Sequence, residues 1–204
     1  MKTLHRPDLF AWSRFDEARN VDFHGYAWIR ADGNVLVDPL PLGEHDRAHL
    51  AAVGGARWIV ITNSDHVRGA AEIAASTGAE IAGPRAEQGR ISVPVARWLG
   101  EGDELVAGLR AMELSGSKTP GELALLLDGT TLVTGDLVRS HAGGRLDRLP
   151  DAKLGDATLA RESIERLAAL PHVDAVLVGD GWPVFRDGRA RLAELCSRLR
   201  GAGP

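Results

Sequence analysis

The sequence predicts a mixed α/β fold in which two sheets pack together and helices cover them on the outside. Two observations support this prediction: short apolar runs alternate with helical patterns from end to end, and each half of the chain carries both hairpin signals and helical segments. No Pro-, Ser- or Gly-rich linker and no internal repeat interrupts the 204 residues. We therefore expect a single domain over residues 1–204.

The first half is expected to contain a hairpin, a helix, a buried strand and a second helix, in that order. The hairpin is indicated by Asp32-Gly33, because this dipeptide favours a tight turn between two strands. The buried strand is indicated by a largely β-branched run, which is typical of a strand covered on both faces. The expected elements are Tyr26–Arg30 with Val35–Asp38, Glu44–Val53, Arg57–Thr62 and His66–Thr77, the last of them capped by Gly78.

The second half is expected to contain three successive strands, a helix, a buried strand and a final helix. Asp128-Gly129 supplies the turn between the second and third of these strands. The only cysteine, Cys196, shares one face of the final helix with leucines, so we expect it to be a buried core residue and not a nucleophile. The expected elements are Leu109–Leu114, Leu123–Leu127, Thr131–Thr134, Ala157–Leu170, Ala175–Val178 and Arg189–Leu199.

The composition excludes several classes of partner. The formal charge of −4 is spread along the chain without a basic block, so neither nucleic acid nor an anionic membrane is expected as a partner. No apolar run approaches the ~20 residues needed to span a bilayer. One cysteine allows neither a disulfide framework nor a Cys-rich zinc cluster. We expect a cytoplasmic protein that binds a small molecule or another protein.

Polar residues follow four of the expected strands, where the apolar runs end. They are Asn63-Ser64-Asp65-His66, Ser117-Lys118-Thr119, Asp136 and Asp180. Loops beyond the carboxyl ends of strands commonly form the site in layered α/β proteins, so we expect these groups to converge. Each has a plainer explanation, since residues 63–65 could cap the helix that follows them and the other aspartates could be turn residues. Lys118 could be an exposed loop lysine.

In order and spacing these segments resemble the metallo-β-lactamase superfamily, whose members usually carry HxHxDH, GHTPG, TGD and GHG segments. Ile61–His66 corresponds to the first segment, in which both leading histidines are replaced and Asp-His remains. Gly116–Gly121 corresponds to GHTPG with one extra residue and with lysine where a metal-binding histidine is expected. Thr134–Asp136 matches TGD fully, and Gly179–Gly181 has aspartate in place of the late histidine. The resemblance implies a four-layer αββα sandwich.

The resemblance also implies that Asp65, His66, Asp136 and Asp180 line one metal position, while Lys118 stands at the other. A set rich in carboxylates and containing one imidazole suits one divalent ion such as Zn²⁺, Mn²⁺ or Fe²⁺, which could generate hydroxide for hydrolysis. In that case Asp65 and Lys118 are the expected catalytic residues, because the Lys118 ammonium could stabilise an oxyanion. The alternative is a site without metal, in which Lys118 pairs with these aspartates.

Further side chains on the same loops are expected around the mouth of a substrate pocket. They are Asn63, Ser64, Arg68, Arg139, His141, Trp182 and Arg186. Arginines that face the pocket would favour an anionic substrate, whereas the alternative for each arginine is a solvated or structural role.

The sequence leaves two functions open. The first is a metal-dependent hydrolase of the ester, thioester or phosphoester class, with an unknown substrate. The second is a scaffold of the same fold that has lost its chemistry and binds a small ligand or a protein partner, with a homodimer as one form. Neither GxGxxG, GxxxxGK[ST] nor GxSxG is present, so a nucleotide-binding enzyme and a serine hydrolase are poorly supported.

Overall fold

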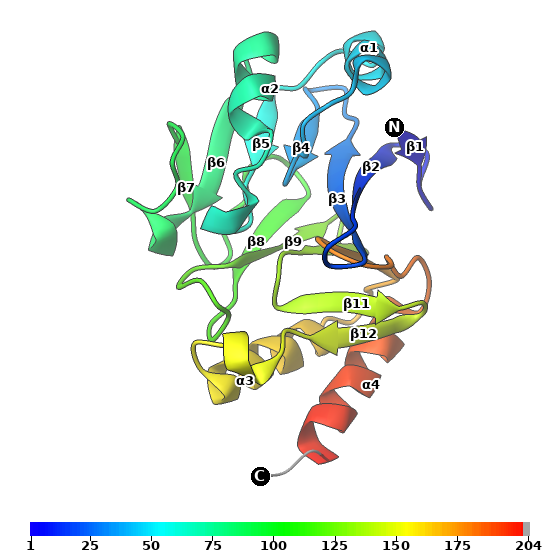
Figure 1. Cartoon of the computed structure of the whole chain (residues 1–204), viewed down its shortest axis with the longest axis vertical. Helices are drawn as coiled ribbons and strands as arrows, with labels where there is room; N and C mark the ends of the chain where they lie inside the picture. The colour runs from blue at the N-terminus through cyan, green and yellow to red at the C-terminus, as the bar shows by residue number, and fades with distance from the viewer. Residues whose placement is uncertain (202–204) are drawn as a thin grey trace. The chain divides into compact units, whose positions relative to one another are not determined.

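The computed structural model of the chain describes residues 1–201 and divides into two compact units, Met1–Trp98 and Leu99 onward. Each unit contains its own sheet, its own helices and its own apolar cluster (Figure 1). The expectation of a single domain over residues 1–204 stays a prediction. Within residues 1–201, no helix is long and apolar enough to cross a membrane.

The first unit is built on a seven-stranded sheet whose strands lie side by side in chain order (Figure 1). The predicted hairpin is confirmed, with Tyr26 opposite Val37, and the predicted buried strand pairs in parallel with a strand on each side. The strands are β1 (Lys2–Thr3), β2 (Leu9–Asp16), β3 (Val21–Trp28), β4 (Val35–Val37), β5 (Trp58–Val60), β6 (Glu80–Pro84) and β7 (Arg97–Leu99).

Two helices of the first unit, α1 (Glu44–Ala52) and α2 (Ala70–Thr77), bury apolar side chains against this sheet. Leu50 of α1 and Ile73 of α2 belong to the same cluster as Leu36 and Ile59, which are neighbours on β4 and β5. A short 3₁₀ segment, η2 (Arg85–Glu87), follows β6.

The prediction of one continuous helix over residues 66–77 is wrong. The segment forms a 3₁₀ turn, η1 (Ser64–His66), and only then the helix α2. The interruption lies at Arg68, whose φ of +40° is left-handed and therefore incompatible with a right-handed helix. The predicted cap at Gly78 is confirmed, with a φ of +76°.

The second unit contains a four-stranded sheet in the order β13-β10-β9-β8 and a separate two-stranded hairpin, β11-β12. All four predicted strands of the larger sheet are confirmed, and Asp128 and Gly129 form the tight turn with positive φ values. The strands are β8 (Leu109–Glu113), β9 (Leu123–Leu127), β10 (Thr131–Thr134), β11 (Val138–Ala142), β12 (Arg145–Arg148) and β13 (Ala175–Val178).

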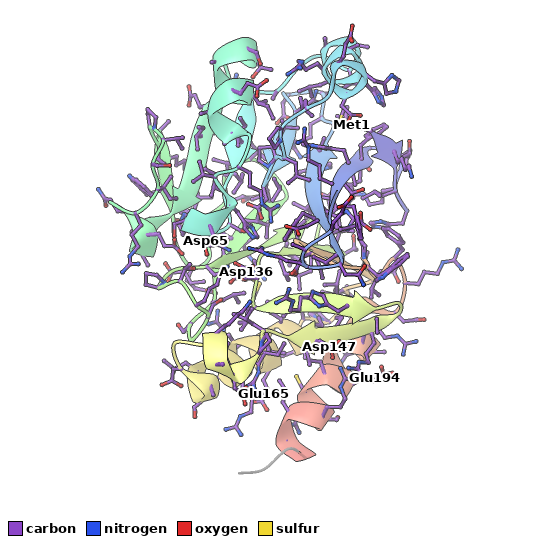
Figure 2. The ribbon with its side chains drawn as sticks, in the orientation of Figure 1. Met1, Asp65, Asp136, Asp147, Glu165 and Glu194 are labelled. Carbon is purple, nitrogen blue, oxygen red and sulfur yellow. The ribbon has the colours of Figure 1, made fainter. Side chains whose placement is uncertain are left out.

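The helices α3 (Ala157–Ala168) and α4 (Gly188–Gly201) pack on one face of the larger sheet, and η3 (Asp151–Lys153) precedes α3. Both helices were predicted. Asp156 is the N-cap of α3. Its side chain accepts hydrogen bonds from the Thr158 and Leu159 N–H groups at 2.8 and 2.9 Å, and such a cap contributes ~1 kcal/mol to stability. Cys196 of α4 is buried in the apolar cluster, as predicted. Ion pairs tie α4 to α3 through Glu165 and to β12 through Asp147 (Figure 2).

Candidate functional site

In the second unit, three of the predicted site residues follow strands that end at the same edge of the sheet. β10 and β13 are parallel neighbours with Thr134 opposite Val178, so Asp136 and Asp180 each come two residues after a paired strand end. β9 is antiparallel to both β8 and β10, so β8 runs in the direction of β10 and the loop after it, which carries Lys118, starts at that edge. The loops that carry Lys118, Asp136 and Asp180 therefore begin at one edge of this sheet.

Lys118 and Asp136 form an ion pair, with Lys118 Nζ 2.9 Å from Asp136 Oδ2. The side chain of Asp136 is 12% exposed and that of Lys118 is 31% exposed, so the pair is partly shielded from solvent. This weakens screening of the attraction relative to a fully exposed pair. Lys118 is thus paired with Asp136, one of the aspartates with which it was expected to pair in a site without metal.

Glu122 is fully buried and contacts the chain neighbours of this pair. Its Oε2 accepts a hydrogen bond from the Ser117 hydroxyl at 2.6 Å, and its Oε1 accepts one from the Leu137 N–H at 2.9 Å. Ser117 precedes Lys118 and Leu137 follows Asp136. One carboxylate therefore joins the two loops that carry the ion pair.

Asp180 lies close to two side chains of β11. The Arg139 guanidinium donates a hydrogen bond to Asp180 Oδ2, and His141 Nε2 lies 3.3 Å from the same oxygen. The hairpin reaches Asp180 because β11 lies close to the loop after β13, where Gly181 has a φ of +91°. A Cβ on Gly181 would lie 1.8 Å from the Ser140 carbonyl oxygen, so only glycine permits this approach.

The second oxygen of Asp180, Oδ1, is buried and has no hydrogen-bond partner among the described residues. A buried acceptor without a partner is costly unless a water molecule or a ligand donor satisfies it. Asp180 therefore has one oxygen fixed by β11 and one available to accept a hydrogen bond.

In the first unit, His66 belongs to a buried network with Asp38, a residue that the sequence did not single out for the site. Asp38 accepts hydrogen bonds from the Thr62 N–H at 2.7 Å and the Thr62 hydroxyl at 2.6 Å. His66 Nδ1 lies 2.7 Å from Asp38 Oδ2, and since a carboxylate only accepts, Nδ1 carries a proton. His66 is 3% exposed, so its ring is part of the interior of this unit.

The residues around His66 have mainly structural contacts. The Asn63 side chain caps η1 by accepting a hydrogen bond from the Asp65 N–H at 3.0 Å, and the Ser64 N–H donates to buried Glu87 at 2.6 Å. Asp65 (Figure 2) is exposed, although its neighbour His66 is buried. Asn63 thus acts as an N-terminal cap, which was the alternative to a role in the site.

Of the other predicted pocket residues, Arg68 has structural contacts, whereas Trp182 and Arg186 are exposed to solvent. Arg68 donates a hydrogen bond to the His24 carbonyl at 2.9 Å and lies over the Phe23 ring, so its contacts are structural. Trp182 is 62% exposed and Arg186 is also exposed. Asp65 and His66 belong to the first unit, whereas Lys118, Asp136 and Asp180 belong to the second. Their convergence into one site and their roles stay predictions.

Asp38 and Glu122 are the polar residues that the sequence reasoning missed. Each adjoins an apolar strand directly: Asp38 follows Val35–Val37, and Glu122 precedes Leu123–Leu127. A charged residue at the end of a fully buried strand requires internal partners, because an unpaired buried carboxylate is expensive. The position of a carboxylate next to a buried apolar run was therefore the sequence feature that could have identified Asp38 and Glu122.

Comparisons with known proteins place the chain in a family. A model of the metallo-β-lactamase superfamily matches residues 1–199. A hydroxyacylglutathione hydrolase from Acidiphilium cryptum is 30% identical over 196 residues, which are 87% of this chain and 77% of that protein. Other relatives of the same name are matched over 44–61% of their length. The chain belongs to the metallo-β-lactamase superfamily.

Solved structures agree on the fold. DIM-1 metallo-β-lactamase has a TM-score of 0.74 at 17% identity, covering 97% of this chain and 95% of that one. TTHA1623, solved in a di-iron-bound form, has a TM-score of 0.69 at 21% identity, covering 90% of this chain and 98% of that one. The predicted fold class and family are therefore confirmed.

The charged residues of the second unit do not by themselves form a site for the metal ion that the fold family implies. Among residues 1–201, no three His, Cys, Asp or Glu side chains are grouped so that they could hold an ion. The two carboxylates of the second unit are already paired with Lys118 and Arg139. His66 does have the carboxylate-held ring that is common among metal ligands, but a single imidazole does not make a site.

Proposed function

We propose that this chain is a hydrolase of small anionic esters or thioesters. The observation that carries the proposal is the alignment of 196 residues, at 30% identity, with a protein named hydroxyacylglutathione hydrolase. A hydroxyacylglutathione is a thioester whose glutathione part bears carboxylate groups. A cation at the site would suit such a substrate, because it attracts both a carboxylate and a developing oxyanion.

Two groups of the second unit support this chemistry. The partly exposed Lys118 ammonium is a hydrogen-bond donor that could stabilise the oxyanion formed when water attacks a carbonyl carbon. Asp180 Oδ1 is an acceptor without a partner among the described residues and could take a proton from the attacking water. Arg139 would hold Asp180 in position by donating a hydrogen bond to its other oxygen.

The experiment is a comparison of three substrate classes with one control variant. Purified protein is assayed with a hydroxyacylglutathione, a p-nitrophenyl ester and a p-nitrophenyl phosphodiester. We expect hydrolysis of the first or second, and Lys118→Ala should lower kcat/KM by roughly 10²–10³, the usual loss on removal of one oxyanion donor. Lys153→Ala, which changes an exposed lysine of η3, is the control. Absence of turnover, or equal losses in both variants, would contradict the proposal.

The second candidate is a scaffold that binds an anionic small molecule or a protein partner without chemistry. The ion pairs favour it, because Lys118–Asp136 and Arg139–Asp180 already satisfy groups that a metal-dependent hydrolase would use on its ion. One bound Zn²⁺, Mn²⁺ or Fe²⁺, as expected from sequence, would compete with Lys118 for Asp136 Oδ2 and with Arg139 for Asp180 Oδ2. A melting temperature that rises with anionic ligands but without turnover would favour the scaffold, and sedimentation would test the expected homodimer.

A further inference from the structure

The two carboxylates at the sheet edge of the second unit are each paired with a cation from the same unit. Lys118 Nζ lies 2.9 Å from Asp136 Oδ2, and the Arg139 guanidinium donates to Asp180 Oδ2. The formal charges of these four side chains sum to zero. A divalent cation that bound to Asp136 Oδ2 or Asp180 Oδ2 would have to displace a side-chain cation from that oxygen, and the displaced cation would repel it.

Glu122 makes the Lys118–Asp136 pair a built feature of the fold. It is fully buried and accepts hydrogen bonds from the Ser117 hydroxyl at 2.6 Å and the Leu137 N–H at 2.9 Å. These two residues are the direct chain neighbours of Lys118 and Asp136. Hydrogen bonds to a buried carboxylate are strong, so the backbones that carry the two partners are fixed relative to each other.

We infer that this edge of the sheet works without a resident metal ion, with the Lys118 ammonium as its source of positive charge and Glu122 as the residue that positions Lys118. A fixed ammonium can polarise a carbonyl or hold a carboxylate of a ligand, but it supplies no metal-bound hydroxide. The inference does not depend on whether the chain hydrolyses esters. Lys118 would supply the positive charge equally in a site that only binds an anion.

The first test measures metal directly. Protein purified without a metal-binding tag is incubated with Zn²⁺, Mn²⁺ or Fe²⁺, passed through a desalting column and analysed by plasma mass spectrometry. We expect far less than one ion per chain, and no change of melting temperature on metal addition. Close to one ion per chain, lost in Asp136→Asn, would overturn the inference.

The second test measures the position of Lys118 by competitive acetylation. The chain has three lysines, Lys2, Lys118 and Lys153, so exposed Lys153 is an internal reference in the same molecule. In wild-type protein Lys118 should react more slowly than Lys153. The ratio of the two rates should rise about threefold in Asp136→Asn and in Glu122→Gln, as expected for loss of a partly exposed ion pair.

Circular dichroism checks that each variant is folded, and Glu122→Asp, which keeps the carboxylate, should restore part of the protection. A positioning role for Glu122 is refuted if Glu122→Gln leaves the Lys118 rate unchanged while Asp136→Asn raises it. Equal rates for Lys118 and Lys153 in wild-type protein would refute the pairing itself.

The outcomes separate this inference from the proposed function. Protein without metal that hydrolyses none of the substrates contradicts the hydrolase and leaves the metal-independent site supported. Hydrolysis that a chelator abolishes and Zn²⁺ restores supports the hydrolase and overturns metal independence. Hydrolysis that is insensitive to chelators supports both.

Discussion

Replacing Asp38 with alanine should cost the first unit roughly 3–5 kcal/mol of stability, because three donors converge on this buried carboxylate. The distances are 2.7 Å to the Thr62 N–H, 2.6 Å to the Thr62 hydroxyl and 2.7 Å to His66 Nδ1. In Asp38→Ala the hydroxyl and the ring nitrogen, 3.1 Å apart, can still pair with each other. The Thr62 N–H is then left buried without a partner.

The magnitude follows from these contacts. An unsatisfied buried donor costs about 1–3 kcal/mol, and each hydrogen bond to a charged group contributes about 1.5–3 kcal/mol. Asp38 also has a φ of +45°, a left-handed conformation that alanine tolerates less well than aspartate. Allowing for the rescue between Thr62 and His66, we expect about 3–5 kcal/mol, which corresponds to a melting temperature lower by roughly 6–20 °C.

The assay is urea and thermal unfolding followed by circular dichroism. Glu17→Ala, in the exposed turn between β2 and β3, is the control and should change stability by no more than about 0.5 kcal/mol. Asp38→Asn should lie between the two, since its carbonyl oxygen can still accept the Thr62 N–H. A loss below about 1 kcal/mol in Asp38→Ala would refute the reasoning, because at least one buried donor would then have found another partner.

Three further predictions concern other parts of the fold. Gly181→Ala should destabilise by about 2 kcal/mol or more, whereas Gly143→Ala, where a Cβ meets nothing within 4 Å, should be nearly neutral by thermal unfolding. Cys196 should react with a thiol reagent only after unfolding, because burial foremost, and then the Glu165 charge, raise its pKa; rapid reaction of native protein would contradict this. Burial raises the pKa of Asp8, but hydrogen bonds from Arg6 and Trp28 outweigh it and lower the pKa overall. Stability from Asp8 is therefore lost as pH falls below about 4, and Asp8→Asn should reduce that loss in acid melting curves.

The strands β9 and β13 of the second unit were predictable because they are continuous apolar runs. Leu123–Leu127 and Ala175–Val178 are buried at every position, and their boundaries match the prediction. In contrast, β2 of the first unit and β11 of the second contain exposed positions without regular alternation, so no periodic pattern predicted them. The predicted helix after Asp65 failed at Arg68, because the apolar pattern continues through a residue whose backbone is left-handed.

For the candidate site, sequence indicated which residues follow strand ends, but not which partners they take. Lys118 and Asp136 are 18 positions apart in the sequence, and only the pairing of β8, β9 and β10 brings their loops to one edge. His66 belongs to the motif that resembles a metal ligand set, yet its partner Asp38 comes from the loop after β4. Such partners depend on strand order and register, which residue types alone do not specify.

The parallel pairing of β10 with β13 also bears on the order in which the chain can mature during synthesis. Lys118, Asp136 and Arg139 are all synthesised before β13, whereas Asp180 follows β13, the last strand of this sheet, which comes after α3 in the chain. Parallel pairs need such long connections and form late, because distant segments must meet. A ribosome-bound chain that stops before Ala175 would thus hold Arg139 without its acidic partner, and would acquire the finished edge only when nearly the whole protein has emerged.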